Sequence, residues 1–160
     1  MAARKKPLAI VRDELARYAE RGVFGSFSET RASDGTAEFK FNWLWKLPFR
    51  LTFDPKRQVI IFKKLLPDVE PGSDLDAALK AFLKECSSAS RPEHRRVDPE
   101  QISVQYANRR GTISLTFRAV AGDYEYTVQR AINLVNELFV GFLNLCYPAY
   151  MAKVFHLPEE

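Results

Sequence analysis

The sequence is poor in the residues that carry most metal, redox and nucleophilic chemistry, with two Cys and two His in 160 residues. Cys86 and Cys146 lie far apart, each in an apolar helical pattern that is typical of small buried hydrophobes. Two such cysteines make neither a disulfide framework nor a metal cluster. His94 and His156 do not have the spacing of zinc ligands. We therefore expect no metal, ordinary surface histidines and a reducing cytoplasm as the location.

Glycine is also scarce, with seven residues that occur singly, as in the turns "SDGTA" and "AGDY". A loop that holds phosphate needs several glycines between a strand and a helix. The chain also lacks a G-x-S-x-G nucleophile elbow and a recognisable Cys–His pairing. The sequence thus predicts no cofactor and no catalytic residue, and we expect a protein that is not an enzyme.

Long hydrophobic runs are missing too. The opening "MAARKKPLAIVRDEL" has an apolar run of only four residues, too short for a signal peptide. The most apolar segment, 131–151, is interrupted by Asn133, Asn136, Glu137 and Asn144, whereas a membrane span needs about 20 mainly apolar residues. We therefore expect no association with a membrane.

The net charge of +4 is unevenly distributed. Residues 1–64 hold 14 Lys and Arg against 7 Asp and Glu, whereas residues 65–100 hold 5 against 8. A basic first half can attract an anionic partner such as nucleic acid, although solvated surface of mixed charge is the commoner reason for such a pattern.

Three helices are predicted from periodicity and caps. Residues 8–20 carry an apolar stripe between Pro7 and Gly22. A second helix begins after the N-cap Ser73 and runs to about residue 86. A long third helix begins after Asp123, ends or kinks before Pro148, and is followed by a short helical segment. Between the second helix and the next strand, residues 87–100 form a long polar loop of the kind that is often mobile or functional.

Strands are predicted from alternation at residues 39–45, 49–53 and 58–64, and for a hairpin at 101–119. A further strand at 23–30 is possible, though glycine interrupts it. The order α-β-β-β-α-β-β-α, or the same order with one extra early strand, indicates an α+β class with an antiparallel sheet and a long C-terminal helix packed on one face. We expect a single domain over residues 1–160, with 1–6 as a flexible basic tail.

The stretch "AEFKFNWLWKLPFRLTFDP", residues 37–55, carries six aromatic rings. Alternation places Phe39, Phe41, Trp43 and Trp45 on one face of a strand. Exposing these rings together would make an aggregation-prone patch, so we expect them in the core. Pro48 cannot donate to a central ladder and is expected to mark a break in the strand.

The predicted solvent-facing positions of the sheet carry no rings, which argues against stacking of nucleic-acid bases there. These positions are Lys40, Asn42, Lys46, Arg50, Thr52, Ser103, Gln105, Ser114 and Thr116. A nucleic-acid-associated basic protein nevertheless stays an alternative interpretation, because non-specific binding needs little more than positive charge.

The element order from Leu8 to about Leu145, and above all "HRRVDPEQISVQYANRRGTISLTFRAVAGDYEYTVQRAINLVNELFVGF", resembles the fold of the YbjN-like proteins and the class I type III secretion chaperones. The resemblance implies a homodimer that binds an extended segment of a partner protein, with no catalytic motif to transfer. The chaperones of this fold are usually acidic, and this chain differs from them in being basic, with a pI of about 9.1.

The leading functional prediction is therefore a non-enzymatic protein-interaction module that forms a homodimer and binds a partner segment. A carrier of a hydrophobic small molecule, held between the sheet and the long helix, is a further alternative. The candidate contacts flank Pro48 or lie on a second apolar strip of the long helix. They are Trp45, Lys46, Phe49, Arg50, Leu134, Leu138 and Leu145.

Overall fold

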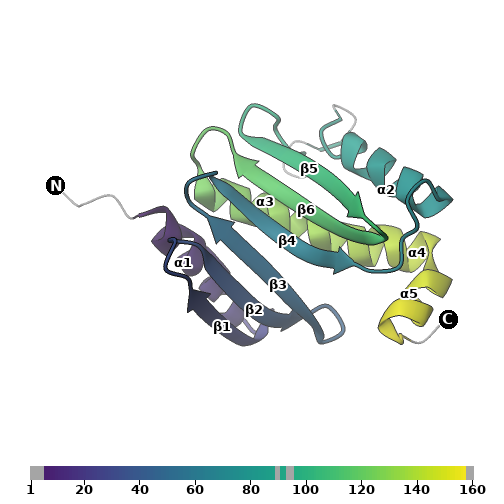
Figure 1. Ribbon diagram of the computed structural model, residues 1–160, viewed down its shortest axis with the longest axis horizontal. Coiled ribbons are helices and arrows are strands. Elements are labelled where there is room, and N and C mark those ends of the chain that lie inside the picture. Colours follow the sequence, from purple (N-terminus) through teal and green to yellow (C-terminus); the bar gives the residue numbers. More distant parts are fainter. Residues whose placement is uncertain (1–5, 89–90, 93–95, 158–160) are drawn as a thin grey trace.

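Six antiparallel strands form one sheet in the computed structural model of the chain, which describes residues 6–88, 91–92 and 96–157. The spatial order is β1-β2-β3-β4-β6-β5, so β1 and β5 are the edges (Figure 1). The strands are β1 (Gly25–Arg31), β2 (Ala37–Trp43), β3 (Leu47–Asp54), β4 (Val59–Leu66), β5 (Ile102–Arg109) and β6 (Thr112–Ala119). The α+β class is confirmed, and the possible early strand is present as β1.

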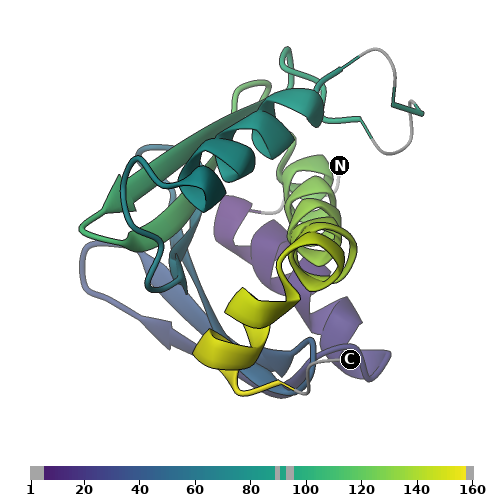
Figure 2. The same cartoon turned by 90° about the vertical axis from the view of Figure 1, so that its right-hand side faces the viewer.

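The helices lie on one side of the sheet and leave its other face open (Figures 1 and 2). The bounds are α1 (Pro7–Glu20), α2 (Asp74–Glu85), α3 (Tyr124–Asn136), the π-helical segment η2 (Glu137–Leu143), α4 (Asn144–Cys146) and α5 (Pro148–Phe155). Helix α1 packs along α3, and α2 packs beside the edge strand β5. Of the predicted basic tail, residues 1–5 lie outside the described residues.

Both predicted N-caps are present. The side chain of Ser73 accepts a hydrogen bond from the backbone N–H of Asp76 at 3.2 Å, and Asp123 accepts one from the N–H of Tyr126 at 2.9 Å. These side chains satisfy donors that the first turn of a helix otherwise leaves unpaired. They explain why α2 and α3 begin where the sequence indicates.

The aromatic face of the β2–β3 hairpin is buried as expected, but it ends at Trp43. Phe41 pairs with Phe49 across the hairpin, with ring centroids 6.1 Å apart. Trp45, predicted to share this face, lies instead in the turn, with φ of +58° and 42% of its surface exposed. The predicted strand extends two residues too far because the chain reverses at 44–46, where strand geometry no longer sets the direction of side chains.

The second apolar strip of the long helix is covered within this chain. Leu134 and Leu138 are 3% and 2% exposed and belong to the hydrophobic core, so they are not available as contacts for another molecule. The sheet together with the other helices supplies the cover for this strip. Leu145, at the end of the same helix, is 73% exposed.

The long helix ends at Cys146, and the chain turns by 111° into α5 at Pro148. No single described helix is long and apolar enough to cross a membrane, and only the bent pair 124–146 and 148–155 meets the length and composition required when taken together. Pro148 acts as predicted, because proline cannot continue a helix from within.

Candidate binding groove

Strand β4 leaves the regular sheet halfway along its length. Phe62 pairs with Leu115 of β6, and the next partners are Leu66 and Ile113, so four steps along β4 match two steps along β6. Lys64, inside this irregular segment, has φ of +53°, a left-handed conformation that is uncommon for a residue other than glycine. Such bulges bend a strand and end its pairing on one side.

The consequence for β3 is a half-strand with one neighbour. Pairing between β3 and β4 runs from Asp54–Val59 to Leu51–Phe62 and then stops. Residues 47–50 continue to pair with β2, but among the described residues no strand pairs with them on the β4 side. The sheet is therefore split between the first half of β3 and the second half of β4.

Pro48 lies inside this half-strand, opposite Asn42 of β2. The predicted break between the two strands lies at residues 44–46, before Pro48, and β3 runs through Pro48 without interruption. Proline is tolerated in strands where no ladder hydrogen bond is required of it, as at an edge. Because Pro48 has no N–H, it offers no backbone donor to a neighbouring strand at this position.

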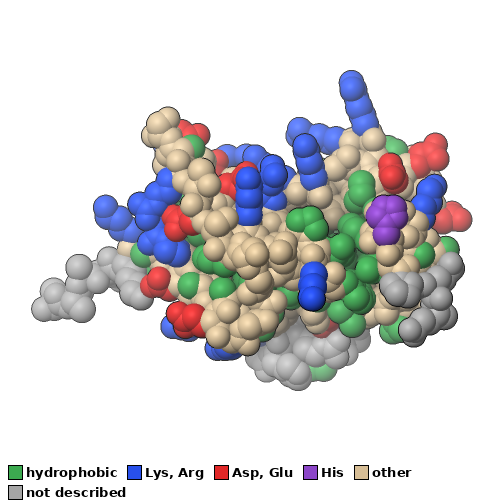
Figure 3. Space-filling model, turned by 90° about the horizontal axis from the view of Figure 1, so that it is seen from below, with side chains coloured by type: hydrophobic (Ala, Val, Ile, Leu, Met, Phe, Trp, Pro, Cys, Tyr) green, Lys and Arg blue, Asp and Glu red, His purple; other side chains and the backbone are tan. Residues whose placement is uncertain are grey.

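A groove with a volume of about 780 Å³ lies at the split. Its floor is apolar, formed by Phe49, Leu65, Pro67, Phe139 and Phe155 among others, and its rim carries Lys40, Arg50, Lys63, Lys64 and Glu38. In the view from below, Lys and Arg side chains stand along the upper border, on the side of the open sheet face, with apolar side chains gathered beneath them (Figure 3). The groove thus combines an apolar base with a basic border.

Helix α5 closes the split from the helical side of the sheet. The hydroxyl of Tyr150 donates a hydrogen bond of 2.7 Å to the carbonyl oxygen of Pro67, just past the end of β4. The ring of Phe155 lies 5.7 Å from that of Phe139, which in turn lies 5.4 Å from Phe49. Burial, together with the charge of Asp68, raises the pKa of Tyr150, so its hydroxyl keeps the proton it donates.

The charges around the groove are unbalanced. Four cationic side chains face one carboxylate, that of Glu38. Glu38 lies 3.6 Å from the ammonium of Lys40 and 3.7 Å from the guanidinium of Arg50. Among the described residues, neither Lys63 nor Lys64 has a carboxylate within ion-pair distance. Positive potential is therefore concentrated on the β4 side of the split.

The segment η2 places Phe139 at the floor of the groove. Segments of π-helix inside α-helices are rare and frequently occur at functional sites. Arg91, from the predicted long loop, forms an ion pair with Glu137 at the start of η2. The loop thus contacts the same segment that forms part of the floor, although residues 89–90 and 93–95 of the loop lie outside the described residues.

The structure brings two of the sequence-predicted contact residues into the groove, Phe49 and Arg50. Trp45 and Lys46 lie in the adjoining turn, exposed, and are not among the lining residues. Lys63 and Lys64 line the groove but are not among the contact residues predicted from the sequence. The signal was present in "VIIFKKLL", where two consecutive lysines interrupt an otherwise apolar strand.

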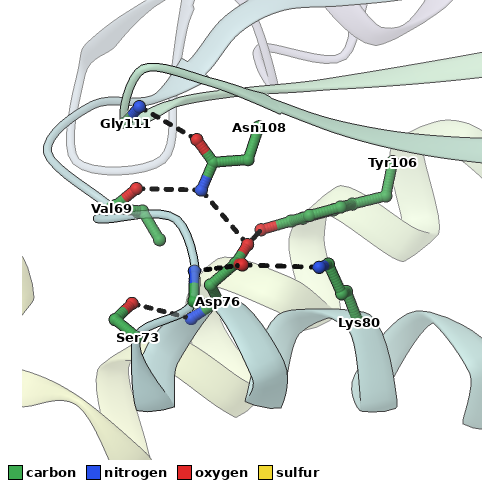
Figure 4. A network of polar contacts seen from close by, with 8 residues as sticks. Val69, Ser73, Asp76, Lys80, Tyr106, Asn108 and Gly111 are labelled. Carbon is green, nitrogen blue, oxygen red and sulfur yellow. Dashed lines mark hydrogen bonds and ion pairs between the residues drawn. The ribbon is translucent and has the colours of Figure 1, made fainter.

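A second cluster of polar side chains surrounds the buried carboxylate of Asp76 (Figure 4). One of its oxygens accepts hydrogen bonds from the hydroxyl of Tyr106 at 2.5 Å and from the amide of Asn108 at 3.1 Å. The other accepts from the backbone N–H of Gly72 at 2.9 Å and lies 3.4 Å from Lys80. The bond from Tyr106 contributes most to lowering the pKa of Asp76, which therefore stays ionised.

The Asp76 cluster joins three segments that are distant in the sequence. It holds helix α2 against β5 and against the connection that follows β4, where the amide of Asn108 also donates to the carbonyl of Val69 at 2.9 Å. The residues that line the groove do not include any of the cluster. Since the carboxylate already accepts from several donors, its arrangement fits a structural anchor for α2.

The remaining chemical candidates from the sequence are dispersed. No group of three or more metal-ligating side chains occurs among the described residues. Cys86 is buried, and burial raises the pKa of its thiol to about 11, whereas Cys146 is exposed. His156 is exposed at the end of α5, and His94 lies outside the described residues.

None of the family models, curated proteins and solved structures with which the chain was compared matches it. The resemblance to YbjN-like proteins and secretion chaperones therefore stays a prediction. The same holds for the homodimer, to which Leu134 and Leu138 could not contribute contacts, since they are covered within the chain.

Proposed function

We propose that the chain is a non-enzymatic protein-interaction module that binds an extended segment of a partner protein at the split between β3 and β4. The observation that carries this proposal is the half-strand 47–50, which has a strand neighbour on its β2 side only. Unpaired backbone N–H and C=O groups of a strand are a template for another extended chain.

The groove next to this half-strand supports the proposal. Backbone pairing supplies affinity in such complexes, and pockets for alternate side chains supply specificity. Here the half-strand adjoins an apolar floor that includes Phe49, Phe139 and Phe155, where a partner side chain can be buried. An extended peptide satisfies both features at once.

The two alternative functions fit the groove less well. A hydrophobic small molecule could contact the floor, but it would leave the backbone groups of residues 47–50 without strand partners. For nucleic acid, the open face of the sheet offers Lys40, Gln105 and similar polar side chains in place of the rings on which bases stack.

The test is a selection of random peptides of about a dozen residues displayed on phage against the immobilised protein, followed by hydrogen exchange of the complex with an enriched peptide. We expect enriched sequences, and protection of amides in segments 47–50 and 62–66, with the β5–β6 hairpin unchanged. Absence of enriched sequences, or protection confined to the edge strand β1, contradicts the proposal.

A further inference from the structure

We infer that the segment bound at the split is acidic, and that Lys63 and Lys64 are the residues that select it. This inference rests on the proposed function, and it adds the chemical class of the partner. It starts from the local geometry of β4, where the two lysines are consecutive and both exposed.

Consecutive side chains of a regular strand point to opposite faces of the sheet. One of the two lysines would then face the helical side, where neighbouring positions such as Phe62 and Leu65 are buried. The left-handed residue Lys64, with φ of +53°, changes this alternation. The bulge therefore brings two ammonium groups to the rim of one groove.

The ammonium groups of Lys63 and Lys64 form no ion pair with any residue in the described part of the chain. The single carboxylate of the groove, Glu38, lies within ion-pair distance of Lys40 and Arg50. Lys63 and Lys64 have no such neighbour among the residues that the structure describes. A segment with Asp or Glu side chains supplies the missing opposite charge, and complementary potentials of this kind determine which partner binds.

The position of the charges also matters for their strength. They border a floor that contains Leu65 and the buried ring of Phe139. Charges beside apolar walls are screened less by solvent and salt than charges on an open surface. A bound acidic segment would cover this rim and exclude further water from it.

Lysines beside an unpaired strand have another known role, which is to prevent the strand from pairing with other chains. The two roles predict opposite results. If the lysines prevent pairing with other chains, no peptide binds at the split. If they determine which partner binds, acidic peptides bind and basic peptides do not.

The experiment compares the wild-type protein with K63E/K64E and with a matched control, K56E/R57E. The control makes the same change of charge in the exposed β3–β4 turn, and neither Lys56 nor Arg57 lines the groove. The same random peptide selection is run on all three proteins. Thermal unfolding of each variant establishes that it is folded before the selection.

We expect the wild-type and control proteins to enrich peptides with an excess of Asp and Glu, and K63E/K64E to lose these peptides and enrich basic ones. For the best acidic peptide, fluorescence anisotropy should show an affinity about tenfold lower for K63E/K64E, and a change below about twofold for the control. The difference should shrink at high salt.

Two results overturn the inference while leaving peptide binding at the split intact. One is enrichment without an excess of acidic residues, and the other is enrichment of the same sequences by wild-type protein and K63E/K64E. The inference is also overturned if an oligodeoxythymidine or phosphatidylserine vesicles bind more tightly than the acidic peptide and K63E/K64E loses that binding too. Absence of enriched peptides from all three proteins contradicts the proposed function itself.

Discussion

Replacement of Phe139 by Leu should weaken the fold and the groove together. Phe139 is 1% exposed, and its ring lies 5.4 Å from Phe49 and 5.7 Å from Phe155. Leucine keeps the position apolar and fills much of the volume, but it loses both ring pairs. Each aromatic pair contributes about 0.5–1.5 kcal/mol beyond the area it buries, so the variant should lose about 1–3 kcal/mol of unfolding free energy.

The matched control is Phe142→Leu, three residues further along the same segment. Phe142 also has two ring neighbours, Phe82 at 5.1 Å and Tyr147 at 5.5 Å, and it does not line the groove. Both variants should therefore lose stability of similar size in urea unfolding followed by tryptophan fluorescence, with an unchanged dependence on urea concentration. For a chain of this length, the midpoint of thermal unfolding should fall by about 2–4 °C per kcal/mol.

The two variants should differ in peptide binding. Phe139→Leu changes the floor of the groove, so a peptide selected on the wild-type protein should bind it more weakly, whereas Phe142→Leu should bind that peptide as the wild type does. A loss of less than about 0.5 kcal/mol in Phe139→Leu would refute the contribution of the ring pairs. Equal loss of peptide affinity in both variants would show that binding depends on overall stability and not on the floor.

Two further predictions concern titratable groups. In the native protein a maleimide should modify Cys146 and spare Cys86, because the thiol of Cys86 is buried and its pKa is raised to about 11. Unfolding in urea should make both cysteines react. Two fast-reacting thiols in the native protein would contradict this prediction. Burial raises the pKa of Tyr106 and of Tyr150, so the folded state holds these protons more tightly than the unfolded chain, and stability should fall as the pH rises above about 10. Tyr106→Phe should reduce this alkaline loss, as urea unfolding at pH 8 and pH 10.5 would measure, and an unchanged pH dependence would contradict it.

Local patterns in the sequence predict most of the elements because each is set by nearby residues. Ser73 and Asp123 fix the starts of helices through hydrogen bonds to residues three positions away, and Pro148 fixes an end. Alternation identifies the strands for the same reason, since it depends only on successive side chains. The error at Trp45 occurs where this locality fails, because a turn changes the direction of the side chains.

The groove could not be predicted in the same way. It depends on which residues of β3 lie opposite β4, and on where that pairing stops at Leu51 and Phe62. Register between strands follows from the packing of the whole sheet, and alternation within a single strand does not determine it. Phe139 comes from a distant part of the chain, so its place on the floor depends on tertiary packing. The same holds for Leu134 and Leu138, whose cover depends on how the other helices pack.

The departures from regular backbone geometry are concentrated near the split. Of the nine described residues other than glycine with positive φ, five belong to its surroundings: Ser26, which lines the groove, Leu44, Trp45 and Lys46 in the turn that precedes β3, and Lys64 in the bulge of β4. Each left-handed residue of this kind costs about 1–2 kcal/mol. Pairing of β3 and β4 to their ends would close the split.

Three features of β3 and β4 oppose that closure, two of them in the same irregular segment of β4. Pro48 removes a donor from β3, the bulge shifts the register of β4, and Lys63 and Lys64 place two like charges at the rim of the groove. Any one of them could be a neutral accident, but all three oppose the same pairing. Sequences generally agree with their folds at every level, and local conflicts concentrate where a site requires them. Here the local conflicts in β3 and β4 coincide with an apolar floor and a basic rim. This coincidence is the reason to look for the function of this chain at the split.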